Sequence, residues 1–228
     1  MNGNDPKDRT EEAGTDFDKM AEKSAFLRCG CYEEARHRIS IRVMNYEHNR
    51  NRLEKMPCVL WEDLAIVFFY EEEGGYGQMI TVQDMTGWGI DIYELYRNAL
   101  IQSRSIHPPY FISMPDLLGV PMEARQEELP MYVLTCKKPA CGSAVMFYPG
   151  ILSELAERLQ GDFYIIPSSI HELILVKKED ADPLETLDII RRVNREELLA
   201  GEILSDSLYE YVSSRDVLRR FRPCAPGV

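Results

Sequence analysis

The sequence lacks any long apolar run. Its longest uninterrupted apolar segment spans Leu64 to Tyr70, whereas a transmembrane helix needs about 20 predominantly apolar residues. Met1 to Lys23 contains no apolar stretch of the kind that forms the centre of a signal peptide. We therefore expect a cytoplasmic protein that does not contact a membrane.

Positive charge is also scarce. The 228 residues include 26 Lys and Arg against 38 Asp and Glu, which gives a formal net charge of -12. Affinity for nucleic acids and for anionic membrane surfaces comes mainly from Lys and Arg, so we expect neither as a partner. The surplus of carboxylates promotes solubility and is compatible with a basic protein partner.

Motifs of several known chemistries are absent as well. The sequence has no Gly-x-Ser-x-Gly elbow of a serine hydrolase. The glycine-rich turn at residues 74–77 lacks the Lys and the Ser or Thr of a phosphate-binding loop. We therefore expect no cofactor.

Six cysteines are scattered along the chain, which does not resemble the disulfide framework of a small secreted domain. Cys136 and Cys141 lie at the two ends of one predicted hairpin loop, so their thiols could meet as a redox pair, or bind zinc together with Cys29 and Cys31. Neither pair has the Cys-x2-Cys spacing of a zinc knuckle, and no His lies nearby. We therefore predict no metal site, with Cys136 and Cys141 as the candidate ligands if one exists.

Composition and charge divide the chain into three parts. Residues 1–24 are acidic and without hydrophobic periodicity, so we predict a disordered acidic tail there. Residues 25–213 are predicted to form one α+β domain, with a possible boundary between two lobes near 116–130. Residues 214–228 are predicted to form a basic C-terminal helix or tail whose arginines point outward.

Hydrophobic periodicity predicts both helices and strands in the domain. The predicted helices span residues 33–55, 91–102, 151–159 and a segment that starts at Pro183, with further helical pieces in 196–211. The predicted strands span residues 58–70, 79–84, 131–135, 144–148, 163–166 and 172–176. Short loops between adjacent strands favour antiparallel pairing. We therefore predict an α+β fold with a mixed, mainly antiparallel sheet built from hairpins and with helices packed on it.

The loop between the last two predicted strands is the strongest candidate site. It carries Ser168, Ser169, His171 and Glu172 at the ends of two apolar strands, a place where sites are often built. A serine nucleophile would need His171 to accept its proton and an acid to orient the imidazole. Glu172 follows His171 directly, so in a strand the two side chains point to opposite faces. The polar run that includes Asp206 could face this loop.

These residues also have a structural interpretation. Ser168 and Ser169 follow a proline, where hydroxyls commonly bond the local backbone of a turn. His171 and Glu172 can hydrogen-bond adjacent segments without any chemistry. We therefore assign no catalytic residue from the sequence. A pocket beside His171 that also contains Asp206 or Asn194 would favour an enzyme.

The order of several short motifs resembles one family. The motifs are Asn45-Tyr46-Glu47-x-Asn49, Asp63-Leu64-Ala65-Ile66-Val67-Phe68, Tyr132-Val133-Leu134-Thr135, Gly142-Ser143-Ala144, Tyr148-Pro149-Gly150, Ile166-Pro167-Ser168-Ser169-Ile170-His171-Glu172, Val193-Asn194 and Leu204-Ser205-Asp206-x-x-Tyr209-x-Tyr211. Over residues 33–211 the chain resembles an uncharacterised domain of unknown function from gut bacteria. Cys136 stands where that family is expected to have Asn. The resemblance implies the extent of the domain and a bacterial cytosolic setting, and it implies no activity.

These observations favour a protein that works by binding. We expect an accessory or regulatory protein with a macromolecular partner, and specifically a protein partner. The alternative is a small hydrolase or ligand-binding enzyme that uses the loop from Ser168 to Glu172.

Overall fold

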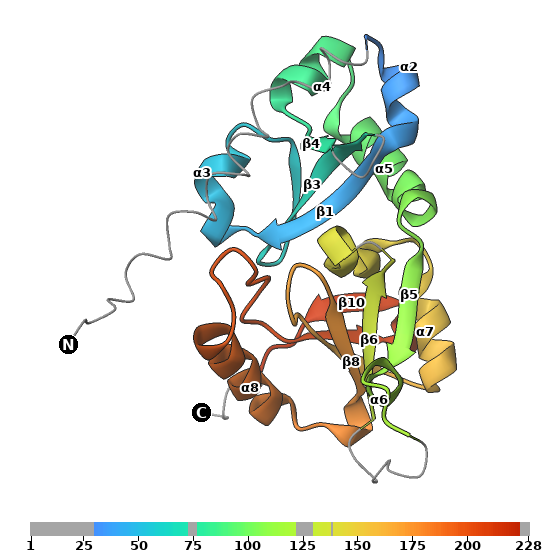
Figure 1. Ribbon diagram of the computed structural model, residues 1–228, viewed down its shortest axis with the longest axis vertical. Coiled ribbons are helices and arrows are strands. Elements are labelled where there is room, and N and C mark those ends of the chain that lie inside the picture. The colour runs from blue at the N-terminus through green and yellow to red at the C-terminus, as the bar shows by residue number, and fades with distance from the viewer. Residues whose placement is uncertain (1–29, 73–76, 122–129, 138, 224–228) are drawn as a thin grey trace, which may run out of the picture.

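The fold is built from two antiparallel sheets that share one hydrophobic core (Figure 1). The computed structural model describes residues 30–72, 77–121, 130–137 and 139–223. The predicted tail at residues 1–24 lies outside these ranges. So do residues 122–129, within the predicted lobe boundary, and residues 224–228.

Sheet A is organised around β3 (Leu64–Glu71), in which every residue is buried. β1 (Ile39–Asn45) pairs along one edge of β3, and β2 (Cys58–Trp61) and β4 (Gly77–Met79) pair with successive parts of the other edge. All three pairings are antiparallel. The central position explains why β3 is apolar on both of its faces.

Sheet B has six strands in the order β10-β9-β7-β8-β6-β5, and each neighbouring pair is antiparallel. The strands are β5 (Pro109–Ser113), β6 (Met131–Cys136), β7 (Phe163–Ile166), β8 (Leu173–Lys177), β9 (Tyr209–Val212) and β10 (Val217–Arg220). The predicted hairpin of residues 163–166 and 172–176 is confirmed as β7 and β8. Two antiparallel sheets with helices packed on them confirm the α+β class.

Helices cover the faces and edges of these sheets. The longer ones are α4 (Val82–Trp88), α5 (Ile92–Ile106), α7 (Ile151–Leu159) and α8 (Pro183–Glu196). The short α-helices are α2 (Tyr32–Ala35), α3 (Arg50–Leu53) and α6 (Met114–Leu117). The 3-10 segments are η3 (Arg36–Arg38), η4 (Glu47–Asn49), η7 (Pro139–Phe147), η8 (Lys178–Asp180) and η9 (Ser213–Arg215). As the sequence predicts, α8 starts at Pro183, and Asp182 caps it by accepting hydrogen bonds from the amides of Leu184 and Glu185.

The largest core cluster joins both sheets. It contains Ile41 and Ile66 of sheet A together with Phe163 and Leu175 of sheet B. A smaller cluster lies beneath α8, on the opposite face of sheet B, and includes Val176 of the strand that also carries Leu175. Because successive residues of a strand face opposite ways, sheet B is covered on both faces.

The predicted long helix of residues 33–55 is wrong. Only α2, at its start, and α3, near its end, are α-helical, and β1 lies between them. The residues Ile39, Val43 and Tyr46 do recur at helical spacing, but Ile41 falls outside that stripe and is fully buried. Residues 39–45 form a strand because the whole segment pairs with the central strand β3.

Three other element predictions need correction. Residues 58–70 form β2 and β3 with a turn at Glu62 (φ 51°) instead of one strand. Residues 79–84 include only the end of β4 before α4 begins, and residues 144–148 lie in and just after the 3-10 segment η7. In η7 Ala144, Val145 and Met146 are all buried. Their apolar run therefore resembles that of a buried strand, although the segment is a 3-10 helix.

The predicted C-terminal helix is also wrong. Asp216 adopts a left-handed conformation (φ 50°), which turns the chain back so that β10 pairs with β9. The predicted helical pieces of residues 196–211 likewise end in a strand, β9. A short segment of apolar and charged residues can fit the period of a helix or that of a strand. Here the turn at Asp216 leads to a hairpin.

Candidate functional site

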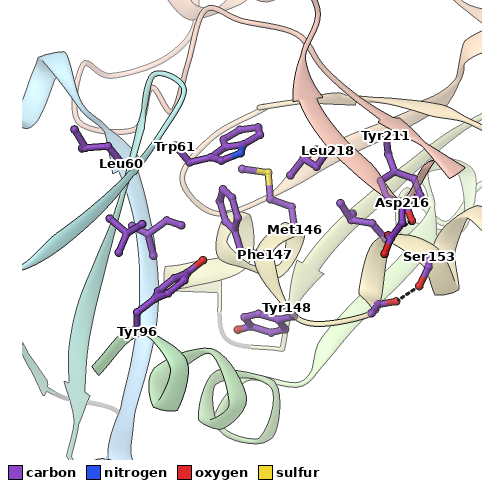
Figure 2. A pocket seen from close by; sticks show the side chains of 14 residues that line it. Leu60, Trp61, Tyr96, Met146, Phe147, Tyr148, Ser153, Tyr211, Asp216 and Leu218 are labelled. Atoms are coloured by element: carbon purple, nitrogen blue, oxygen red, sulfur yellow. Dashed lines mark hydrogen bonds between the residues drawn. The ribbon is translucent and has the colours of Figure 1, made fainter. Parts of the chain in front are cut away.

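An open cleft of about 340 Å³ lies between sheet A and the β9–β10 hairpin (Figure 2). Its apolar lining comes from β2, η7 and β10 and includes Val59, Leu60, Trp61, Met146, Phe147 and Leu218. A cavity of this volume reaches the range of small-ligand and peptide-anchor sites, which are mostly apolar with a few polar groups. It is formed by segments far apart in the sequence.

Trp61 lies at the centre of this lining. Its ring meets Phe147 edge-on with centroids 5.3 Å apart and Tyr209 with centroids 5.2 Å apart. Figure 2 shows Trp61, Met146 and Phe147 side by side. Aromatic pairs in such offset or edge-on arrangements stabilise each other beyond the area that they bury. The wall is therefore packed in place before anything binds.

Asp63 fixes the β2–β3 turn beside the cleft. Its carboxylate accepts hydrogen bonds from the hydroxyls of Ser205 (2.6 Å), Ser207 (2.8 Å) and Tyr209 (2.7 Å). Burial alone would raise the pKa of Asp63, but these three hydrogen bonds outweigh it and hold the pKa below its ordinary value. Asn45 adds a hydrogen bond from its side-chain amide to the carbonyl of Leu204. These contacts fasten sheet A to the strand that forms the other wall.

The polar side chains that line the cleft include three tyrosines, Ser153 and Asp216. The hydroxyl of Tyr211 donates to Asp216 at 2.6 Å. Burial and this neighbouring carboxylate raise the pKa of Tyr211 to about 12, and burial raises the pKa of Tyr96. Both phenols are therefore protonated at neutral pH, which suits hydrogen bonding better than proton abstraction.

The cleft lies next to β2, an edge strand of sheet A. Val59, Leu60 and Trp61 all line it, although alternate side chains of a strand point to opposite faces. The lining also includes Ile66 of β3, the register partner of Val59, so the cleft touches one face of sheet A at β2. Within the described residues, β2 pairs only with β3, so its other edge is unpaired there.

The predicted polar loop lies at a different place, beneath α8. A smaller apolar cavity of about 190 Å³ there is lined by Ile166, Ser168, Ile174, Ile190 and Asn194, among others. Asn194 donates from its side-chain amide to Asp206 (2.8 Å) and to the carbonyl of Ser205 (2.9 Å). The structure therefore brings Ser168 and Asn194 to one cavity, with Asp206 hydrogen-bonded to Asn194.

The other contacts of the loop include hydrogen bonds within it and one with Thr135. Ser168 donates to Glu172 at 3.5 Å, and the hydroxyl of Ser169 accepts from the amide of His171. The carbonyl of His171 accepts from the hydroxyl of Thr135 at 2.8 Å. His171 is not among the residues that line the cavity beneath α8. The arrangement assembles Ser168 with a carboxylate, and the imidazole is not part of the cavity wall.

The candidate metal ligands are only partly described. Cys136 is buried at the end of β6, and the side chain of Cys141 lies outside the described residues, as does Cys29. Among the side chains that the structure describes, no group of three or more His, Cys, Asp or Glu is arranged to hold a metal ion.

Sequence reasoning missed the cleft because β2, which lines it, is separated from β3 by a turn that was not predicted. The triplet Trp61-Glu62-Asp63 interrupts an otherwise apolar run with two acidic residues. That interruption is a hairpin signal, since acidic and turn-forming residues separate paired strands. No local pattern, however, places Trp61 beside Phe147.

Comparison with known proteins identifies the family. A family model described as a family of unknown function (DUF5688) matches residues 3–213. The chain belongs to this family. The match confirms the resemblance to a domain of unknown function and covers a longer range than residues 33–211. No curated protein and no solved structure matches the chain.

The chain offers no membrane-spanning helix in its described part. None of the helices among the described residues combines the length and the apolar character needed to cross a bilayer.

Proposed function

We propose that this family member is a bacterial, cytoplasmic accessory or regulatory protein that binds an extended segment of a partner protein in the cleft beside β2. The observation that carries the proposal is a cleft lined by three consecutive residues of β2 and by aromatic rings, next to a strand with one unpaired edge among the described residues. Extended peptides bind such edges by adding a strand, and pockets for their alternate side chains give specificity.

The exposed surface of the cleft supports a macromolecular occupant. Leu60 stands at its edge with 55% of its surface exposed, while Trp61 and Phe147 form the floor. An apolar anchor side chain of the partner would bury Leu60 and complete contact with the two rings. Buried aromatic and aliphatic anchors of this kind supply most of the binding energy of an interface.

The charge of the protein selects among such segments. With a formal net charge of -12, the molecule attracts cationic partners over a long range and repels acidic ones. We therefore expect the bound segment to carry an apolar anchor flanked by Lys or Arg. High salt would lower the rate of association strongly and change the rate of dissociation less.

Trp61 gives a direct readout of occupancy. The only other tryptophan, Trp88, packs against Tyr32 at the end of α4, so Trp88→Phe leaves Trp61 as the single tryptophan reporter. Short random peptides displayed on phage would be selected on this variant and then titrated while Trp61 emission is recorded. We expect selected peptides to shift that emission and to share an apolar anchor with basic flanks.

A matched pair of surface variants tests the location. Leu60→Lys places a charge at the cleft, whereas Leu184→Lys makes the same change on α8 at a residue with nearly equal exposure, 54% against 55%. Peptide binding should be lost in the first variant and kept in the second. Peptides that bind both variants equally, or a selection that yields no peptide, would refute the proposal.

A second candidate function is a small hydrolase or ligand-binding enzyme at the cavity beneath α8. The observation that favours it is the presence of Ser168 and Asn194 on one apolar cavity wall. An activated Ser168 would react with a fluorophosphonate probe, and the labelling should disappear in Ser168→Ala and persist in Ser169→Ala. Absence of labelling in the wild-type protein would refute the hydrolase alternative, since Ser168 would then be unreactive.

A further inference from the structure

The β9–β10 hairpin has a second face, opposite the one that lines the cleft. Tyr211 and its register partner Leu218 line the cleft. Val212 and Val217, also paired, and Arg219 line a different cavity. This separation follows from the two-residue period of a strand, so the two surfaces can be altered independently.

The second cavity has a volume of about 400 Å³ and a cationic lining. Besides the two valines it is lined by Asp162, Lys178, Ser214, Arg215 and Arg219. These residues come from the start of β7, the end of β8 and the β9–β10 hairpin. Three cations therefore converge on one hollow of a protein whose overall charge is strongly negative.

Two carboxylates are already engaged here: Asp162 in the cavity lining and Glu210, which contacts two of the lining cations. Glu210, only 5% exposed, contacts both Lys178 and Arg219, the latter at 2.7 Å. Asp162 accepts hydrogen bonds from both the amide (2.8 Å) and the hydroxyl (2.7 Å) of Ser213. One carboxylate is thus shared between two cations, and the other is held by neutral donors.

The balance of charge leaves an excess of positive charge. Lys178, Arg215 and Arg219 supply three positive charges against the two negative charges of Asp162 and Glu210. Arg215 is exposed at the tip of the hairpin and makes no ion pair with the described residues. An anion entering the cavity would meet its guanidinium without first breaking an ion pair.

We infer that this cavity binds the phosphate group of a small phosphorylated molecule. Guanidinium groups present paired donors that match phosphate oxygens, and lysine adds a compact positive charge. The hydroxyl of Ser214 lies in the same lining and can donate a further hydrogen bond. A volume of about 400 Å³ exceeds that of a phosphate ion, which leaves room for the organic part of the ligand.

Inorganic phosphate and pyrophosphate are the probes for this site. Isothermal titration at low ionic strength, with the full chain, should detect both, and pyrophosphate should bind more tightly. Arg215→Ala and Arg219→Ala should each weaken binding about tenfold, the loss expected for one charge-assisted hydrogen bond. Arg220→Ala is the matched control, because Arg220 pairs with Tyr209 and follows Arg219 on the opposite face of the same strand.

Glu210→Gln should change the affinity for phosphate in the opposite direction. The substitution keeps the shape of the side chain and removes the charge that Lys178 and Arg219 share, so phosphate should bind several-fold more tightly. A thermal melt of each variant separates lost binding from lost folding. Equal weakening by Arg219→Ala and Arg220→Ala, or binding that Glu210→Gln leaves unchanged, would overturn the inference, because attraction would then depend on overall charge alone.

Discussion

Tyr209 donates a hydrogen bond of 2.7 Å to Asp63, across 146 positions of sequence. The contact joins the β2–β3 turn of sheet A to β9 of sheet B. The ring of the same tyrosine lies against Trp61, with centroids 5.2 Å apart. One residue therefore ties the two sheets together and supports the floor of the cleft.

Asp63→Asn should destabilise the protein by about 3 kcal/mol, because an amide cannot accept from three hydroxyl donors at once and leaves buried polar groups unpaired. Tyr209→Phe removes one donor and should cost about 1.5 kcal/mol. Urea unfolding followed by circular dichroism measures both. A double-mutant cycle between the two positions should give a clear coupling energy, and strict additivity would contradict the proposed network.

Acid should weaken the fold through Asp63 and Glu71. Burial works against ionisation of Glu71, but hydrogen bonds from His107 and Ser40 prevail, so the pKa of Glu71, like that of Asp63, lies below its ordinary value. The unfolded chain then binds more protons than the folded one, so stability rises with pH in this range. The stabilisation is complete above the ordinary pKa values of 4.5 and 3.8 and is lost as pH falls through the lower folded-state values.

The double variant Asp63→Asn, Glu71→Gln checks the assignment. It should be less stable than the wild-type protein at pH 7 and should lose less stability between pH 5 and the acid limit. Urea midpoints measured across that range give the slopes. Parallel curves for the two proteins would show that other groups carry the acid sensitivity.

The strands buried on both faces could be predicted from sequence. The runs that became β3, β7 and β8 are apolar at nearly every position, a pattern that fits the interior of a sheet. The loop between β7 and β8 was also placed correctly. Such segments can be recognised from sequence alone, because a strand that is buried on both faces has apolar residues at nearly every position.

Segments with polar residues on one face could not be predicted as well. In residues 33–55 the spacing of Ile39, Val43 and Tyr46 matches a helix, and only the partner strand β3 reveals β1. The C-terminal strand β10 depends in the same way on the turn at Asp216. Tertiary pairing outweighs local periodicity in both segments.

The candidate sites show the same limit. Local polarity identified Ser168 and its loop, and the structure places Ser168 with Asn194 at one cavity. The cleft depends on Trp61, Phe147 and Leu218, which no short motif connects. Sites formed by distant segments require knowledge of strand order, which a single sequence does not contain.

Ser103 protects the outer edge of sheet A. Its hydroxyl accepts a hydrogen bond from the amide of Ile41 at 2.8 Å and donates to the carbonyl of Ala99 within α5. Ser103→Ala would leave a buried amide of β1 without its acceptor, at a cost of about 2 kcal/mol. Ser105→Ala, at an exposed position of the same helix, is the control and should change stability little. Equal urea midpoints for the two variants would refute this role.

Gly142 lets η7 pass directly against the polar loop. A Cβ at this position would lie 1.7 Å from the carbonyl oxygen of His171 and 2.2 Å from the hydroxyl of Thr135. Gly142→Ala must therefore displace backbone, which should cost about 3 kcal/mol. It should also break the hydrogen bonds from Ser143 and Thr135 that hold the loop.

Gly161→Ala is the matched control, because a Cβ there meets nothing within 4 Å. Amide hydrogen exchange should show faster exchange across residues 168–172 in Gly142→Ala and unchanged exchange in Gly161→Ala. Because η7 also carries Met146 and Phe147 of the cleft, Gly142→Ala should weaken peptide binding beside β2 even where the protein remains folded. Unchanged exchange at the loop together with unchanged stability would mean that η7 can move away from β6 freely, which the buried side chains of Ala144, Val145 and Met146 argue against.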